Sequence, residues 1–146
     1  IGGGVPLAAL LATEAVSCFE PGDQGGTYNG NPLMTAVGSA VFDVMSTPSF
    51  LHTVEQRGEQ LKRKLEGLSQ DFALGAVSGK GLLLALETGK QSAPEIVKRA
   101  FTEGFLLNAP RENRLRFMPA LNVSCDEIEE MAQGLEKILK ELCDGR

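Results

Sequence analysis

Several kinds of residue are scarce in this 146-residue chain, and each scarcity excludes a class of function. Tryptophan is absent and there is a single tyrosine, so recognition by aromatic stacking is poorly supplied. One histidine, His52, and three widely spaced cysteines, Cys18, Cys125 and Cys143, match no familiar zinc pattern. We therefore expect no metal site, and an odd number of scattered thiols is most simply explained by a reducing, cytoplasmic compartment.

Positive charge is also in short supply. The chain has 14 basic and 19 acidic side chains, a formal net charge of -5, with no basic stripe of the kind that binds nucleic acid. An anionic ligand must then be bound locally, by backbone N–H groups or by one well-placed arginine. The apolar run at residues 1–12 is too short to span a bilayer and lacks a basic flank, so we expect no membrane or targeting segment.

The first 32 residues are rich in glycine and proline and predict connecting chain around one short buried strand, at residues 7–11. Asn31-Pro32 then supplies an N-cap followed by proline at the first helical position. The apolar spacing from Leu33 to Met45 predicts a helix that is apolar on nearly every side. We expect this helix to be buried on most sides.

The clearest helical periodicity runs from Leu51 to Phe72 and predicts an amphipathic helix packed on a domain. Three short apolar runs after it predict strands, and two capping boxes, at Ser92/Glu95 and Ser124/Glu127, predict helix starts. The expected strands are 82–86, 105–107 and 115–117, and the expected helices are 94–103 and 124–142. This order predicts a small α+β layer at residues 51–146, after a segment at 1–30 and a connecting helix at 31–50.

Several glycine-rich segments are candidate phosphate sites. Gly2-Gly3-Gly4 lacks the last glycine of the dinucleotide pattern, and Gly79-Lys80 and Gly89-Lys90 lack the rest of a P-loop. The segment 25–32 leads into a helix and places the Thr27 hydroxyl beside backbone N–H groups, an arrangement suited to a phosphate. The alternative is a plain tight turn before the helix.

Arg114 and Arg116 fall on one face of a short predicted strand. If Arg116 faces a cleft, its planar guanidinium suits a carboxylate. The alternative is a solvated or salt-bridged arginine. His52 has no nucleophile pattern near it, so no Ser-His-Asp arrangement is indicated, and we interpret it as structural or exposed.

Four stretches, in this order, resemble the class III, pyridoxal-phosphate-dependent aminotransferases, and among them the acetylornithine aminotransferases. They are IGGGVPLAALLAT (1–13), PGDQGGTYNGNPL (21–33), GKGLLLALE (79–87) and LLNAPRENRLRFMPALNVS (106–124). The resemblance implies an α/β fold of fold-type I, of which this chain is a C-terminal portion. That portion comprises the end of the large domain (1–30), an interdomain helix (31–50) and the small α+β domain (51–146).

The resemblance also assigns roles. Thr27 matches a threonine that donates to the phosphate of pyridoxal 5'-phosphate across a dimer interface, and Gly26 matches a position, often serine, that lines the cofactor and substrate pocket. Arg116 matches the arginine that binds the substrate α-carboxylate. The family's Schiff-base lysine lies just upstream of Ile1, so the sequence holds no catalytic residue and we expect this chain alone to be inactive.

The resemblance implies a cytoplasmic homodimer that moves an amino group between N-acetylornithine, or a similar ω-amino substrate, and 2-oxoglutarate in arginine biosynthesis. Gln24, Gly26 and Ser78 depart from a common histidine, serine and arginine, which affects substrate detail more than reaction class. The alternatives are a class III aminotransferase for ornithine, succinylornithine or 4-aminobutyrate, an aminomutase, and a non-catalytic binding module. The helix at 33–45 argues against the module, because alone it would expose a large apolar surface.

Overall fold

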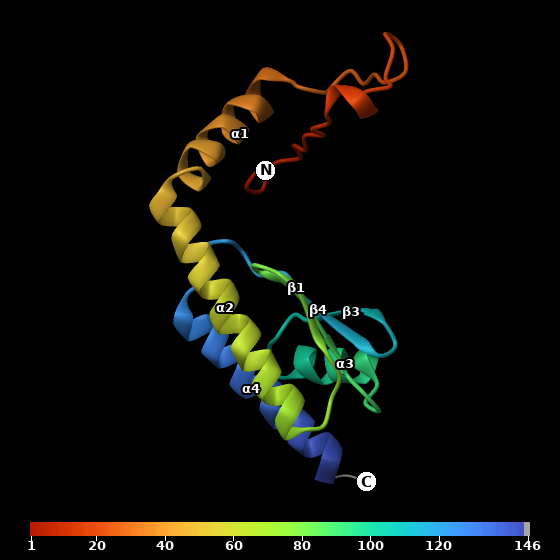
Figure 1. The fold of residues 1–146 in the computed structure, drawn as a ribbon, viewed down its shortest axis with the longest axis vertical. Coiled ribbons are helices and arrows are strands. Elements are labelled where there is room, and N and C mark those ends of the chain that lie inside the picture. The colour runs from red at the N-terminus through yellow and green to blue at the C-terminus, as the bar shows by residue number, and fades with distance from the viewer. Residues whose placement is uncertain (145–146) are drawn as a thin grey trace. The chain divides into compact units, whose positions relative to one another are not determined.

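The computed structural model describes residues 1–144, which form two compact units that divide after Leu51 (Figure 1). No helix in the described part of the chain combines the length and the apolar content that crossing a bilayer requires. The elements are η1 (Glu14–Val16), α1 (Pro32–Met45), α2 (Pro48–Asp71), β1 (Val77–Lys80), β2 (Leu83–Glu87), α3 (Ala93–Thr102), β3 (Asn108–Arg111), β4 (Arg114–Phe117) and α4 (Cys125–Asp144).

Helix α1 begins where the sequence predicts. The Asn31 side chain accepts a hydrogen bond from the backbone N–H of Met34 at 3.1 Å, and Pro32 occupies the first helical position. The expected burial of this helix is wrong for the described chain: Gly38 is its only buried residue, and Leu33 is 67% exposed. The physical reason is that residues 1–30 supply little cover, because nearly all of them are themselves exposed or half-buried.

The predicted strand at residues 7–11 is wrong. This run has no strand partner among the described residues, and Leu10 and Leu11 are 79% and 93% exposed. An apolar run becomes a strand only where a neighbouring strand takes up its backbone hydrogen bonds. Without that neighbour the segment is extended but irregular.

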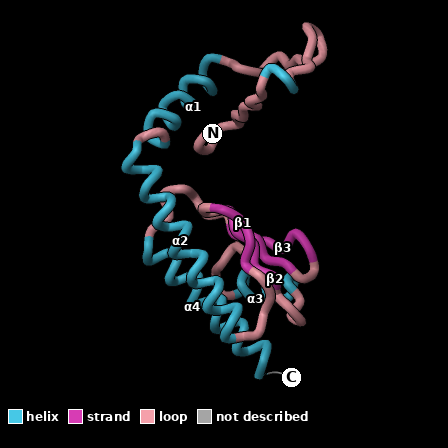
Figure 2. Tube along the Cα trace, viewed as in Figure 1, coloured by secondary structure: helices cyan, strands magenta, loops and turns pink. Residues whose placement is uncertain are grey.

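The second unit is built on an antiparallel sheet with the strand order β1-β2-β4-β3 (Figure 2). The strands predicted at 82–86 and 115–117 are confirmed as β2 and β4. The strand expected at 105–107 is wrong in position, because β3 begins at Asn108, and β1 was not predicted. Both β1 (VSGK) and β3 (NAPR) are edge strands of low strand propensity, and they form because β2 and β4 offer partners.

Helices α2, α3 and α4 cover one face of this sheet (Figure 1), and their apolar stripes form a single core with it. The helices predicted at 51–72, 94–103 and 124–142 are confirmed, with α2 starting one turn earlier. The fully or nearly fully buried members of the core are Leu61, Leu65, Leu68, Leu82, Leu84, Leu86, Ala93, Ile96, Ala100, Leu115, Phe117, Ile128, Leu135, Ile138 and Leu139.

One of the two capping boxes is complete. At α4, the Ser124 hydroxyl accepts from the Glu127 backbone N–H (3.1 Å) and the Glu127 carboxylate accepts from the Ser124 backbone N–H (2.8 Å). At α3, Ser92 accepts from the Glu95 backbone N–H, but the Glu95 carboxylate pairs with Arg99 one turn along the helix. The α3 box is therefore only half formed.

The glycine within the apolar stripe of α2 is explained by close packing. Gly58 is buried against the turn between β1 and β2, and a Cβ built on it would lie 2.8 Å from the carbonyl carbon of Gly81. Since that neighbour is backbone, it cannot rotate away. Only glycine lets α2 approach the hairpin this closely.

We predict that Gly58→Ala lowers the free energy of unfolding by about 1–3 kcal/mol, because helix and hairpin must separate. Gly67→Ala is the matched control in the same helix: a Cβ there meets nothing within 4 Å, so alanine should raise stability by about 0.5–1 kcal/mol through helix propensity. Thermal and chemical unfolding of both variants measures the difference. Equal effects of the two substitutions would contradict the close packing.

Candidate functional site

The residues singled out by the sequence fall in different units. Gly26 and Thr27 lie in the unit of residues 1–51, in the loop before α1. Arg116 lies in the unit that follows, on strand β4.

The loop before α1 is shaped by two turns. The Asn29 N–H donates to the Gly26 carbonyl at 3.0 Å, and the Asn31 N–H donates to the Tyr28 carbonyl at 3.3 Å. Thr27, between these turns, is exposed, and neither its hydroxyl nor its N–H bonds to any residue in the range 1–144. A free hydroxyl beside a free backbone N–H is a donor set that fits a phosphate group.

The space above Gly26 is filled by the side chain of Asn29. A Cβ built on Gly26 would lie 2.8 Å from the Asn29 Oδ1 atom and 2.9 Å from Nδ2. The amide of Asn29 therefore stands where a serine side chain at position 26 would lie. The sequence pattern indicates Gly26 but not Asn29, because the position of the Asn29 side chain depends on the fold of the loop.

The loop contains only neutral donors. The first basic residue of the chain is Arg57, so the charged side chains of residues 1–51 are all acidic. Residues 28–31 of the loop line an open hollow together with Pro6, Leu7, Ala8 and Met34, but Gly26 and Thr27 do not line it. A phosphate at Thr27 would be held by hydrogen bonds alone within this unit.

Strand β4 separates its apolar and its charged side chains onto two faces. Leu115 and Phe117 are buried in the core, whereas Arg114 and Arg116 alternate with them and lie on the face that the helices of this unit do not cover. Arg114 pairs with Glu87, its direct neighbour on β2. Arg116 lies opposite Ala85 and has no ion-pair partner among the described residues, which leaves its guanidinium available for an anion.

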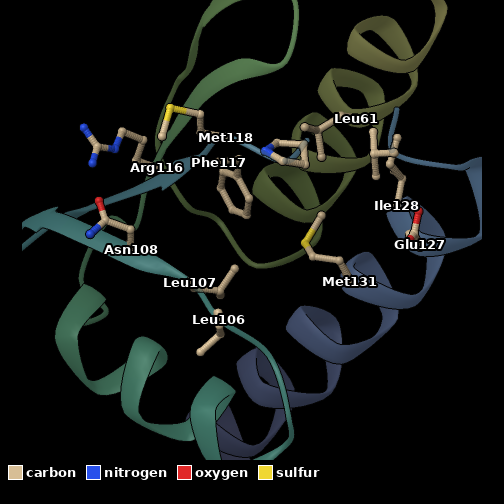
Figure 3. Close-up of a pocket in the computed structure, with 12 residues that line it drawn as sticks. Leu61, Leu106, Leu107, Asn108, Arg116, Phe117, Met118, Glu127, Ile128 and Met131 are labelled. Atoms are coloured by element: carbon tan, nitrogen blue, oxygen red, sulfur yellow. The ribbon is translucent and has the colours of Figure 1, made fainter. Parts of the chain in front are cut away.

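A cavity of about 350 Å³ opens beside this strand, and nine of its twelve lining residues are apolar. Figure 3 shows the guanidinium of Arg116 and the amide of Asn108 directed away from Phe117, Leu107 and Met131. Arg116 therefore lies at the cavity's edge with its charged end on the open face of the sheet. The lining residues are Leu61, Leu106, Leu107, Asn108, Arg116, Phe117, Met118, Pro119, Val123, Glu127, Ile128 and Met131.

Glu127 is the one acidic side chain in the cavity lining. The backbone N–H of Ser124, and then its hydroxyl, donate to the carboxylate and hold the pKa of Glu127 below its usual value of 4.5. The carboxylate is thus ionised at neutral pH and engaged in the cap of α4. Within residues 1–144, Glu127 therefore caps α4 and forms no ion pair with Arg116.

The model of the family described as "Aminotransferase class-III" matches residues 1–139 of the chain. The chain belongs to this family. It is 54% identical over 143 residues to the acetylornithine aminotransferase of Ralstonia nicotianae, covering 96% of this chain and 36% of that protein. It is 38% identical to the acetylornithine aminotransferase of Caldanaerobacter subterraneus, and the match covers 97% of this chain and 36% of that protein. The chain thus spans about a third of the length of these relatives.

Solved structures of aminotransferases share the fold. The N-acetylornithine aminotransferase of Stenotrophomonas maltophilia superposes with a TM-score of 0.75 at 24% identity, over 81% of this chain and 34% of that chain. The acetylornithine aminotransferase of Elizabethkingia anophelis gives a TM-score of 0.74 at 26% identity, over 84% of this chain and 33% of that chain. The fold class expected from the sequence, an α/β pyridoxal-phosphate-dependent transferase of fold-type I, is confirmed.

Proposed function

We propose that this chain is part of an aminotransferase that moves an amino group between N-acetylornithine, or a similar ω-amino substrate, and 2-oxoglutarate. The observation that carries the proposal is the guanidinium of Arg116, which lies on the open face of the sheet and has no ion-pair partner among residues 1–144. In a class III aminotransferase, every amino acid or 2-oxo acid substrate brings a carboxylate that such a group can bind. The place of the reaction in arginine biosynthesis, in the cytoplasm, is part of the proposal.

Arg116 is the proposed anchor for the substrate α-carboxylate. A planar guanidinium binds a carboxylate through two parallel hydrogen bonds, which fixes orientation as well as charge. The neighbouring Arg114 cannot take this role, because Glu87 already neutralises it. Arg116 thus binds and orients the substrate without taking part in proton transfer.

Thr27 is the proposed donor to the phosphate of pyridoxal 5'-phosphate, through its hydroxyl and backbone N–H. The cofactor, when bound, supplies the electron-withdrawing ring that makes transfer of the amino group possible. Gly26 and the amide of Asn29 line the same part of the loop. These residues hold and orient the phosphate, and no proton of the reaction passes through them.

We further propose a homodimer in which Thr27 serves the site of the neighbouring subunit. Support comes from the apolar surface of the first unit, since a soluble protein rarely leaves so many large side chains uncovered. The most exposed of them are Leu10, Leu11, Val16, Phe19, Tyr28, Leu33, Phe42 and Val44. A second copy of the protein is the partner that the resemblance implies for this surface.

A comparison of substrates tests the reaction. The full-length protein should transaminate N-acetylornithine with a higher kcat/KM than ornithine or 4-aminobutyrate, with 2-oxoglutarate as acceptor. We expect no turnover from the 146-residue chain alone, because the resemblance places the family's Schiff-base lysine outside these residues. Inactivity of the full-length protein toward N-acetylornithine would overturn the proposed substrate.

The two arginines of β4 form a matched pair for the carboxylate anchor. In the full-length enzyme, Arg116→Gln should raise KM for both carboxylate substrates by about ten-fold or more, as expected for a lost charge-assisted hydrogen bond, with little change in melting temperature. Arg114→Gln should leave KM unchanged and cost at most about 1 kcal/mol of stability, because the pair with Glu87 is partly exposed. A raised KM in Arg114→Gln with an unchanged KM in Arg116→Gln would show that Arg114, and not Arg116, binds the carboxylate.

Thr27→Val removes the proposed donor while keeping the shape of the side chain. The full-length variant should lose cofactor more readily on gel filtration, followed by cofactor absorbance, because one hydrogen bond to the phosphate is gone. Thr13→Val is the control, since Thr13 is also exposed in the first unit and its hydroxyl caps nothing. Equal cofactor retention by the wild type and Thr27→Val would count against Thr27.

A further inference from the structure

Asn108 is placed beside Arg116 by the pairing of β3 with β4. The two residues are direct partners across the antiparallel pair. Side chains of such partners stand on the same face of the sheet, with Cβ atoms about 4.5–5.5 Å apart. Figure 3 shows the amide of Asn108 and the guanidinium of Arg116 extending on that face, at the edge of the same cavity.

The Asn108 side chain has no hydrogen-bond partner within residues 1–144, and it is exposed. Its amide offers two N–H donors and one carbonyl acceptor. The row that crosses the sheet at this level consists of Ser78, Ala85, Arg116 and Asn108, so it contains one positive charge and no acid. On the same face, one flanking row holds Glu87, which Arg114 neutralises, and the other holds Lys80 opposite Leu83.

We propose that Asn108 is a second recognition residue for the substrate carboxylate, which it binds together with Arg116. The proposal rests on the proposed function of Arg116. One amide N–H donates to a carboxylate oxygen, while the guanidinium supplies the charge and its own hydrogen bonds. A neutral donor beside one cation adds direction to the site without adding a second charge, which favours a single carboxylate group over a phosphate.

Two substitutions at position 108 test the role of the amide. An aspartate has the same shape as asparagine but would itself pair with Arg116 and compete with the substrate. An alanine removes the donor and leaves the charge of Arg116 untouched. Alanine therefore tests the hydrogen bond alone, whereas aspartate removes the donor and also adds a negative charge.

The experiment uses the full-length enzyme and measures two quantities, KM for the amino donor and Kd for glutarate, an unreactive dicarboxylate, by isothermal titration calorimetry. Asn108→Ala should raise both by about ten-fold, as for a lost hydrogen bond to a charged group, with kcat nearly unchanged. Asn108→Asp should raise both further, by about a hundred-fold, because a carboxylate fixed next to Arg116 occupies it.

Arg111→Gln is the matched control. Arg111 is exposed on the same strand, but its register partner on β4 is Arg114 and not Arg116. Replacing Arg111 by glutamine changes the net charge by the same amount as Asn108→Asp. We expect its KM and glutarate Kd to stay within two-fold of the wild type. A similar loss of affinity in Arg111→Gln and Asn108→Asp would show a general charge effect and overturn the proposal.

The outcomes separate this inference from the proposed function. An unchanged glutarate Kd in Asn108→Ala overturns the role of Asn108, whatever the activity. If alanine lowers the melting temperature, Asn108→Leu decides, because leucine keeps the approximate size of the side chain, removes the amide donor and places no carboxylate next to Arg116. A merely structural role would leave the glutarate Kd of Asn108→Leu unchanged. A wild type that binds glutarate through Asn108 but does not transaminate would support the recognition role and overturn the reaction.

Discussion

The register between β2 and β4 is the constraint on which the candidate site depends. Leu84 faces Phe117 and Leu86 faces Leu115 on the side that packs against the helices. A slip of one residue in β4 would turn these apolar side chains outward and drive two guanidinium groups into the core. Because burying an unpaired charge is far more costly than losing a strand contact, the core fixes the face on which Arg116 stands.

The same register decides which arginine is available. Arg114 and Arg116 are chemically identical and share a face, yet the residues opposite them on β2 are Glu87 and Ala85. The carboxylate at position 87 takes one guanidinium, and the methyl group at position 85 offers the other no partner. The residues of β2 therefore determine which arginine is available for an anion, although β2 contributes no residue to the proposed carboxylate anchor.

Helix caps and the alternation of apolar and charged residues were enough to predict those helices and strands that depend on interactions between residues close in sequence. Asn31 and Ser124 cap α1 and α4 as expected, and the alternation of β4 placed Arg116 on the face opposite Leu115. The strands β1 and β3 escaped prediction because pairing with a central strand, and not their own propensity, holds them. Asn108 was missed for the same reason. Asn108 lies beside Arg116 because of the β3–β4 pairing, which includes an irregularity in register, and no sequence motif indicates that pairing.

Charge is distributed unevenly along the chain, and this sets what each proposed subsite can do. The loop around Thr27 offers neutral donors in a segment without one basic residue. A phosphate monoester carries about -1.5 to -2 charges near neutral pH, and hydrogen bonds from neutral groups orient such an ion without neutralising it. In the proposed enzyme the loop therefore positions the cofactor phosphate, and compensating positive charge must come from residues outside the first unit. Arg116, by contrast, joins charge and direction in one side chain. In the proposed enzyme, the charge that binds the substrate carboxylate therefore comes from this chain, whereas the loop around Thr27 supplies only hydrogen bonds to the cofactor phosphate.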